Sequence, residues 1–142
     1  MIRLYIRNLQ KRLPVDRALV KKIVEAVCSK ENPGLKQQIS VCLVTDTRIR
    51  KLNERFHHCD GPTDVLAFSL SDDPNEVIAD IFVSTDTAVA QSRIYRTDPR
   101  YEMYLYVIHG LLHIAGYNDL TAAGRRSMRR KEKQYLTICM NQ

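Results

Sequence analysis

The sequence predicts an α+β fold in which a mixed four-stranded sheet is covered by about five helices. The N-terminal part reads as strand, helix, strand and helix, an order that implies a crossover between parallel strands. Further along, two apolar runs at 63–70 and 77–84 are joined by the short polar loop SDDPNE, as in an antiparallel pair. With 142 residues, we expect one domain over residues 1–142.

The first four elements follow from local patterns. IRLYIRN at 2–8 has strand character, and after Pro14 apolar residues recur at helical spacing over residues 15–30. The β-branched run ISVCLVT at 39–45 predicts a second strand. A helix over residues 45–58 then begins at a Thr/Asp cap and places its apolar side chains on one face.

From Thr85 onward the sequence is helical. Residues 85–96 begin at a Ser/Thr/Asp cap, and a second helix follows Pro99 over about 100–115. This second helix is apolar nearly all round, so we expect it to be the central buried helix. A third helix covers residues 120–140, with Met128, Tyr135, Leu136 and Cys139 expected to face the core.

Composition limits the class of protein. Lys and Arg number 22 against 16 for Asp and Glu, which gives a formal charge of +6 and favours polyanionic partners, although a plain solvated basic surface has the same composition. The four cysteines form no CxxC pair, and Cys42 lies in an apolar run as a buried thiol would. Because no apolar stretch approaches roughly 18 residues, we expect a cytoplasmic protein with no membrane contact.

The motif HGLLHIAGYND at residues 109–119 predicts a metal site. His109 and His113 are four residues apart, so both imidazoles lie on one helix face and can chelate one ion. A catalytic zinc site usually has a third protein ligand. Gly116 can end the helix and turn the chain, which makes Asn118 and Asp119 the candidates, and a carboxylate binds zinc better than an amide. The alternative is a core helix whose two histidines have hydrogen-bond partners.

The sequence disfavours two classes of metal-dependent enzyme, the zincin metalloproteases and the zinc deaminases. The zincin motif HExxH has its general base directly after the first histidine, where this chain has Gly110. The PCxxC element of the zinc deaminases is missing as well. Neither observation excludes a metal-dependent hydrolase of small phosphoesters, which stays an alternative.

These residues resemble a known family. HGLLHIAGYND is similar to the signature HGxLHLxGYDH of the YbeY family of metal-dependent bacterial endoribonucleases. LNERFHHCDGPTDVLAFSL at 52–70 resembles the block LNxxYRxxDxPTDVLSF of that family, and VIADIFVS resembles LGDIxIS. The likeness extends from about residue 40 onward. It implies a single-strand-specific endoribonuclease that processes ribosomal RNA at the 3′ end of the small-subunit RNA and acts in ribosome maturation or quality control.

The chain departs from the family pattern at two positions that carry chemistry. The third histidine ligand of the family falls at Asp119, which keeps an anionic oxygen donor. We therefore expect one Zn²⁺ per chain on His109, His113 and Asp119, with Mn²⁺ or Mg²⁺ as alternatives. The position of the family arginine near the site is occupied here by His57. We expect His57 to be catalytic, either by binding phosphate more weakly than an arginine would or by transferring a proton.

The last helix carries the expected RNA surface. The run GRRSMRRKEK contains Arg125, Arg126, Arg129 and Arg130 and begins just after the metal motif, although a charge run is often only a solvated helix face. The expected partners are RNA, especially ribosomal RNA, and the small ribosomal subunit. The rival hypothesis is a noncatalytic ribosome-associated RNA-binding factor with a degenerate metal site. Nothing in the sequence decides the oligomeric state, and a monomer is assumed.

Overall fold

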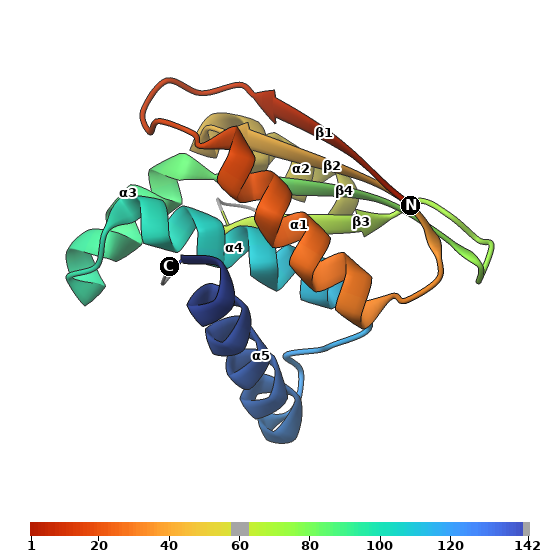
Figure 1. The fold of residues 1–142 in the computed structure, drawn as a ribbon. Coiled ribbons are helices and arrows are strands. Elements are labelled where there is room, and N and C mark those ends of the chain that lie inside the picture. The colour runs from red at the N-terminus through yellow and green to blue at the C-terminus, as the bar shows by residue number, and fades with distance from the viewer. Residues whose placement is uncertain (58–62, 141–142) are drawn as a thin grey trace.

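The computed structural model describes residues 1–57 and 63–140, apart from the side chains of Phe56 and His57. These residues form one four-stranded sheet and five helices, whose arrangement can be followed in Figure 1. The elements are β1 (Ile2–Asn8), α1 (Arg17–Glu31), β2 (Lys36–Val44), α2 (Asp46–His57), β3 (Val65–Ser69), β4 (Glu76–Ser84), α3 (Thr85–Tyr95), α4 (Pro99–Ile114) and α5 (Ala122–Met140).

The sheet has the order β1-β2-β4-β3 and is mixed, as the sequence predicts. β1 pairs in parallel with β2, and α1 forms the crossover between them. β2 also pairs in parallel with β4, whereas β3 and β4 form the antiparallel hairpin. The predicted α+β class and the βαβ start are therefore confirmed, with the second strand beginning at Lys36, a little earlier than the expected residue 39.

Helices cover both faces of the sheet. α1 and α4 pack on one face with α5 beside them, and α2 lies on the other face against β3 and β4 (Figure 1). Side chains of the strands alternate between these two faces. Along β2, for example, Ile39, Val41 and Leu43 enter the main core, while Cys42 and Val44 join a smaller cluster beneath α2.

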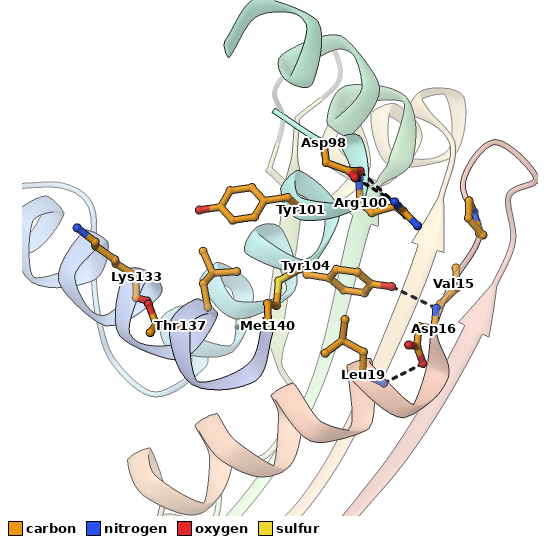
Figure 2. Close-up of a pocket in the computed structure, with 12 residues that line it drawn as sticks. Val15, Asp16, Leu19, Asp98, Arg100, Tyr101, Tyr104, Lys133, Thr137 and Met140 are labelled. Carbon is orange, nitrogen blue, oxygen red and sulfur yellow. Dashed lines mark hydrogen bonds and ion pairs between the residues drawn. The ribbon is translucent and has the colours of Figure 1, made fainter. Parts of the chain in front are cut away.

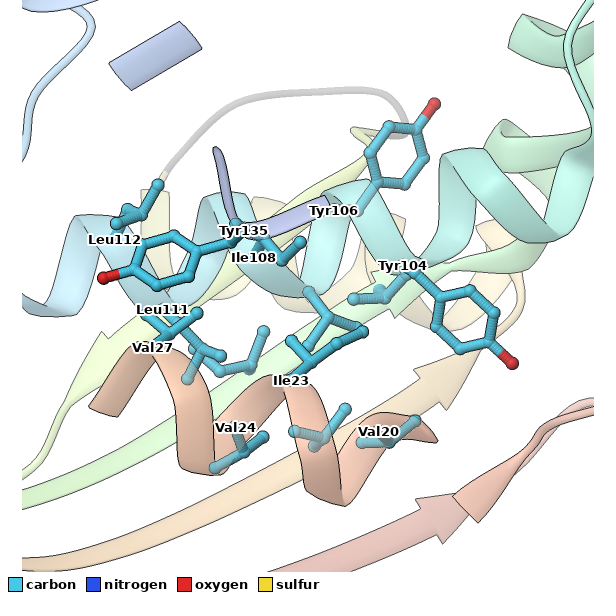
Figure 3. Close-up of a cluster of buried hydrophobic side chains, with 14 of the residues drawn as sticks. Val20, Ile23, Val24, Val27, Tyr104, Tyr106, Ile108, Leu111, Leu112 and Tyr135 are labelled. Atoms are coloured by element: carbon cyan, nitrogen blue, oxygen red, sulfur yellow. The ribbon is translucent and has the colours of Figure 1, made fainter. Parts of the chain in front are cut away.

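The predicted central helix is α4. Its buried side chains pack between α1 and the sheet, where Figure 3 shows Ile108 and Leu111 facing Ile23 and Val27 of α1. Gly110 allows α4 to approach the sheet, because a Cβ atom there would lie 2.7 Å from Cγ2 of Ile81. This close approach sets the histidines on either side of Gly110 beside the hairpin.

The ends of α4 follow from its sequence. The side chain of Asp98 accepts a hydrogen bond from the Arg100 amide, and Pro99 occupies the first turn, where its missing N–H is not needed. Gly116 has a φ of 107°, a conformation that favours glycine, and turns the chain away from the helix. None of the helices in the described residues is long and apolar enough to cross a membrane.

Candidate metal centre

His109 and His113 present their imidazoles on one face of α4, as the four-residue spacing predicts. The two Nε2 atoms lie 3.0 Å apart, and the ring centroids are 4.7 Å apart with the planes inclined at 72°. Both side chains are partly buried, with exposed fractions of 23% and 33%. Two imidazole nitrogens therefore point at the same small volume from a rigid helix.

Asp119 reaches that volume from the turn after α4. The turn is held by hydrogen bonds from the Gly116 amide to the His113 carbonyl and from the Tyr117 amide to the Leu112 carbonyl. It places Oδ2 of Asp119 3.7 Å from Nε2 of His109 and 3.5 Å from Nε2 of His113. Among the described residues, these three form the one cluster of histidine, cysteine or carboxylate side chains that could hold an ion.

Asn118, the other candidate for the third ligand, has a local role. Its Oδ1 atom accepts a hydrogen bond from the Leu120 amide at 3.1 Å, in the manner of an Asx turn. Of the two candidates in the turn, Asp119 lines the cleft together with both histidines, whereas the Asn118 side chain is bonded to the turn itself.

The three donor atoms fit a zinc ion. Tetrahedral zinc with bonds of roughly 2.0–2.1 Å requires neighbouring donor atoms about 3.3 Å apart. The observed separations of 3.0, 3.5 and 3.7 Å lie on both sides of that value. Because 44% of the Asp119 side chain is exposed, the site keeps an open side, which is typical of catalytic rather than structural zinc sites.

Glu132 of α5 orients the first of the two histidines. Its Oε2 atom lies 2.7 Å from Nδ1 of His109, and only 12% of the Glu132 side chain is exposed. Since a carboxylate accepts, His109 carries its proton on Nδ1 and offers the lone pair of Nε2 to an ion. Burial lowers the pKa of His109, but the Glu132 hydrogen bond and the charges of Glu132, Asp64 and Asp119 outweigh it and raise the pKa.

Sequence reasoning missed Glu132, which stands as a single acid in the basic run GRRSMRRKEK. A usable signal was nevertheless present. Glu132 lies four residues after Met128 and three before Tyr135, and both of these are buried. Helical periodicity therefore places Glu132 on the inward face of α5, where an isolated carboxylate needs a partner.

A second carboxylate, Glu31 at the end of α1, anchors the turn that carries Asp119. The hydroxyl of Tyr117 donates to Oε1 of Glu31 at 2.8 Å, and the hydroxyl of Tyr135 donates to Oε2. Lys131 also lies 3.4 Å from this carboxylate, whose side chain is 10% exposed. Burial raises the pKa of Glu31, but its hydrogen bonds from Tyr135 and Tyr117 and the charge of Lys131 lower the pKa overall.

The ligands line a cleft of about 450 Å³ between α4 and the edge strand β3. Arg125 of α5 borders this side of the molecule, since its Nη1 atom donates to the Asp119 carbonyl at 3.2 Å. The other arginines of the expected RNA surface, Arg126, Arg129 and Arg130, are exposed on the same helix. His57 ends α2, and its side chain lies outside the described residues, as does His58.

A larger cavity of about 710 Å³ lies elsewhere, between the start of α1, the start of α4 and the end of α5 (Figure 2). Its two acids have local structural roles. Asp16 caps α1 by accepting from the Leu19 amide, while Asp98 caps α4 and pairs with Arg100 at 3.0 Å. It contains none of the three candidate ligands, so size alone does not locate the site.

Comparisons with known proteins agree with the motif. The family model described as Endoribonuclease YbeY matches residues 5–139. The Endoribonuclease YbeY of Carboxydothermus hydrogenoformans is 35% identical over 134 residues, which cover 93% of this chain and 94% of that protein. The Endoribonuclease YbeY of Salinibacter ruber is 34% identical over 134 residues, which cover 89% of this chain and 85% of that protein.

A solved structure shares the fold as well. The solution structure of TM1509 from Thermotoga maritima superposes with a TM-score of 0.62 at 29% identity, covering 96% of this chain and 87% of that chain. The family match spans both histidines, Asp119 and Glu132. The resemblance found from the sequence is thus confirmed: the chain belongs to the Endoribonuclease YbeY family.

Proposed function

We propose that this chain is a metal-dependent endoribonuclease that cleaves single-stranded RNA and processes ribosomal RNA, with the 3′ end of the small-subunit RNA as its substrate region. Family membership supports the enzyme class. The cytoplasm is the proposed compartment, and the small ribosomal subunit is the proposed partner in ribosome maturation or quality control.

The triangle of donor atoms from His109, His113 and Asp119 is the observation that carries this proposal. A divalent ion held there supplies Lewis-acid chemistry to phosphodiester hydrolysis, by activating water and offsetting charge on the phosphoryl oxygens. Zn²⁺ fits the mixed nitrogen and oxygen donors, and Mn²⁺ or Mg²⁺ are the alternatives that an oxygen ligand admits.

The protein itself supplies orientation and charge. Glu132 holds the proton on Nδ1 of His109, which fixes the ring and keeps Nε2 available. Asp119 is the only anionic group among the three ligands, so a divalent ion bound there would leave the site with a net positive charge that attracts a phosphate. Arg125, which donates to the Asp119 carbonyl, is proposed to contact phosphate together with Arg126, Arg129 and Arg130 of α5. His57 is proposed to contribute phosphate binding or proton transfer.

A cleavage assay tests this function. Purified protein is incubated with a labelled single-stranded RNA, with the same RNA annealed to its complement, with the equivalent DNA and with a chromogenic phosphodiester. We expect cleavage of single-stranded RNA alone, loss of cleavage with a chelator, recovery with zinc or manganese, and no cleavage by His109→Ala. RNA cleavage that persists in His109→Ala with the chelator would contradict the proposal.

The chain's departures at Asp119 and His57 favour one second candidate, a noncatalytic ribosome-associated RNA-binding factor with a degenerate metal site. This candidate predicts RNA binding that survives both chelation and Asp119→Ala, with no cleavage under any metal condition. Binding and cleavage measured on the same RNA separate the two functions.

A further inference from the structure

The face of the sheet opposite α4 is partly uncovered. α2 packs on this face against β3 and β4, whereas β1 is the strand at the opposite edge of the sheet. Ile2, Leu4 and Ile6 of β1 pack toward the main core, so the alternate residues Arg3, Tyr5 and Arg7 point to the uncovered side. In Figure 1, β1 forms the outer edge of the sheet, away from α4.

Tyr5 is an exposed aromatic ring between two arginines. Its exposed fraction is 49%, and Arg3 and Arg7 on either side are exposed as well. Alternate residues of a strand are spaced by roughly 6.7 Å, so the guanidinium groups of Arg3 and Arg7 flank the Tyr5 ring on the same face of β1. Neither arginine forms an ion pair with any of the described side chains.

The basic character continues from β1 onto α2. Arg7 and Arg48 both lie near the Cys42 thiol: burial and the charge of Asp80 raise the pKa of this thiol overall, and the two positive charges only reduce that rise. Beyond Arg48, a hollow of about 430 Å³ is lined by Arg48, Lys51 and Arg55 of α2. The neighbouring acid on this face of the sheet is the half-buried Asp80 of β4, which pairs with Ser40 in the sheet register.

We propose that Arg3, Tyr5, Arg7, Arg48 and Lys51, here called the β1–α2 surface, form a second binding site for single-stranded RNA on the sheet face away from the metal centre. A sequence-tolerant single-strand site combines a cationic track for phosphates with an aromatic ring for a base, and this surface has both parts. A base stacked on Tyr5 would have its flanking phosphates near Arg3 and Arg7.

The choice of RNA as the ligand rests on the proposed function, since a family of endoribonucleases has RNA as its substrate. The surface itself does not depend on the metal centre, because none of its residues lines the cleft between α4 and β3. Its contribution is therefore expected to raise RNA affinity without changing the chemistry of cleavage.

The test measures binding of a fluorescently labelled single-stranded RNA by anisotropy, using protein with all 142 residues and a chelator in the buffer so that no cleavage occurs. We expect Tyr5→Ala to weaken binding by about tenfold, the effect of losing one stacked base, and Tyr5→Phe to bind like the wild type. Arg3→Gln/Arg7→Gln is expected to weaken binding and to reduce the slope of log affinity against log salt by roughly 1.4, as two lost phosphate contacts imply.

Matched controls remove the same groups from another part of the surface. Tyr95→Ala removes a tyrosine that is 66% exposed on α3, and Lys21→Gln/Arg93→Gln removes two exposed charges from α1 and α3. Equal binding by wild type, Tyr5→Ala and Arg3→Gln/Arg7→Gln would overturn the proposal, as would losses no larger than those of the controls. In that case the arginines serve only to protect the edge strand from pairing.

Ultraviolet cross-linking gives a second measurement that needs no variant. Cross-links from the bound RNA to the peptide containing Tyr5 support the proposal, and cross-links confined to α5 and the metal cleft contradict it. Because binding is measured without metal, the two proposals can fail separately. If the β1–α2 surface binds no RNA, the wild type still cleaves RNA but Tyr5→Ala binds RNA as tightly as the wild type. If the protein is not a nuclease, no RNA is cleaved but Tyr5→Ala still binds RNA more weakly than the wild type.

Discussion

Nδ1 of His109 lies 2.7 Å from Oε2 of Glu132, so a residue in the most basic stretch of the chain fixes the first ligand of the candidate metal centre. The pair joins α4 to α5. Since α5 also carries the arginines expected to bind RNA, the orientation of the ligand and the position of that surface depend on the same helix packing.

Replacing Glu132 by glutamine should weaken zinc binding by roughly 10- to 100-fold, because the partner that holds the tautomer and raises ligand basicity is lost. Zinc affinity is measured by competition with a chromophoric chelator. Glu25→Gln, at an exposed position of α1, is the matched control and should bind like the wild type. An unchanged zinc affinity in Glu132→Gln would show that the carboxylate does not act on the site.

The two tyrosines on Glu31 should separate positioning from stability. Tyr117→Phe and Tyr135→Phe each remove one hydroxyl from Glu31 and should each lower the free energy of unfolding by about 1 kcal/mol. Only Tyr117 stands in the turn that delivers Asp119, so only Tyr117→Phe should also weaken zinc binding several-fold. The same chelator competition measures this, and equal zinc affinities in the two variants would argue against an anchoring role.

Glu31 should also make the free energy of unfolding depend on pH in the acidic range. Its pKa is lowered in the fold, so its stabilising contribution is present at pH values above roughly 4.3 and is lost as the pH falls through the folded pKa. Urea unfolding of metal-free protein at a series of acidic pH values should show this loss. Glu31→Gln should be less stable at neutral pH and should show a flatter acid limb, whereas parallel curves would exclude Glu31 as the source.

Gly110→Ala tests the close approach of α4 to the sheet. In an exposed helix this change stabilises by up to about 1 kcal/mol. Here the new Cβ atom would lie 2.7 Å from Ile81 and 3.1 Å from Val65, so we expect destabilisation by about 1–3 kcal/mol in urea unfolding. Increased stability would mean that the helix and the hairpin have room between them.

Much of the fold follows from local patterns in the sequence. Alternation in residues 2–8 predicts β1, and Pro99 followed by an apolar run predicts α4, in both cases without reference to the rest of the chain. The hydrophobic pattern begins at residue 39, whereas β2 begins at Lys36, because Gln37 is polar although its side chain is buried and donates to the Cys28 carbonyl. A polar residue with a distant partner is not visible to a pattern of hydrophobicity.

The site was predictable where its residues are close in sequence. The His109 and His113 pair and the turn to Asp119 lie within one motif, and the structure brings their donor atoms together. Glu132 lies 13 residues after Asp119, and Glu31 lies far earlier in the chain, at the end of α1. Their roles therefore depend on how α1, α4 and α5 pack together. The role of His57 stays a prediction, since its side chain is outside the described residues.

Metal content of untagged protein, measured by elemental mass spectrometry for wild type and Asp119→Ala together, tests the central claim most directly. We expect about one zinc or other divalent transition ion per wild-type chain, as three protein ligands imply, and little or none in the variant. Circular dichroism should show that both proteins are folded. A wild type that holds no ion even after reconstitution, or a variant that holds as much as the wild type, would contradict the assignment of His109, His113 and Asp119 as a metal centre.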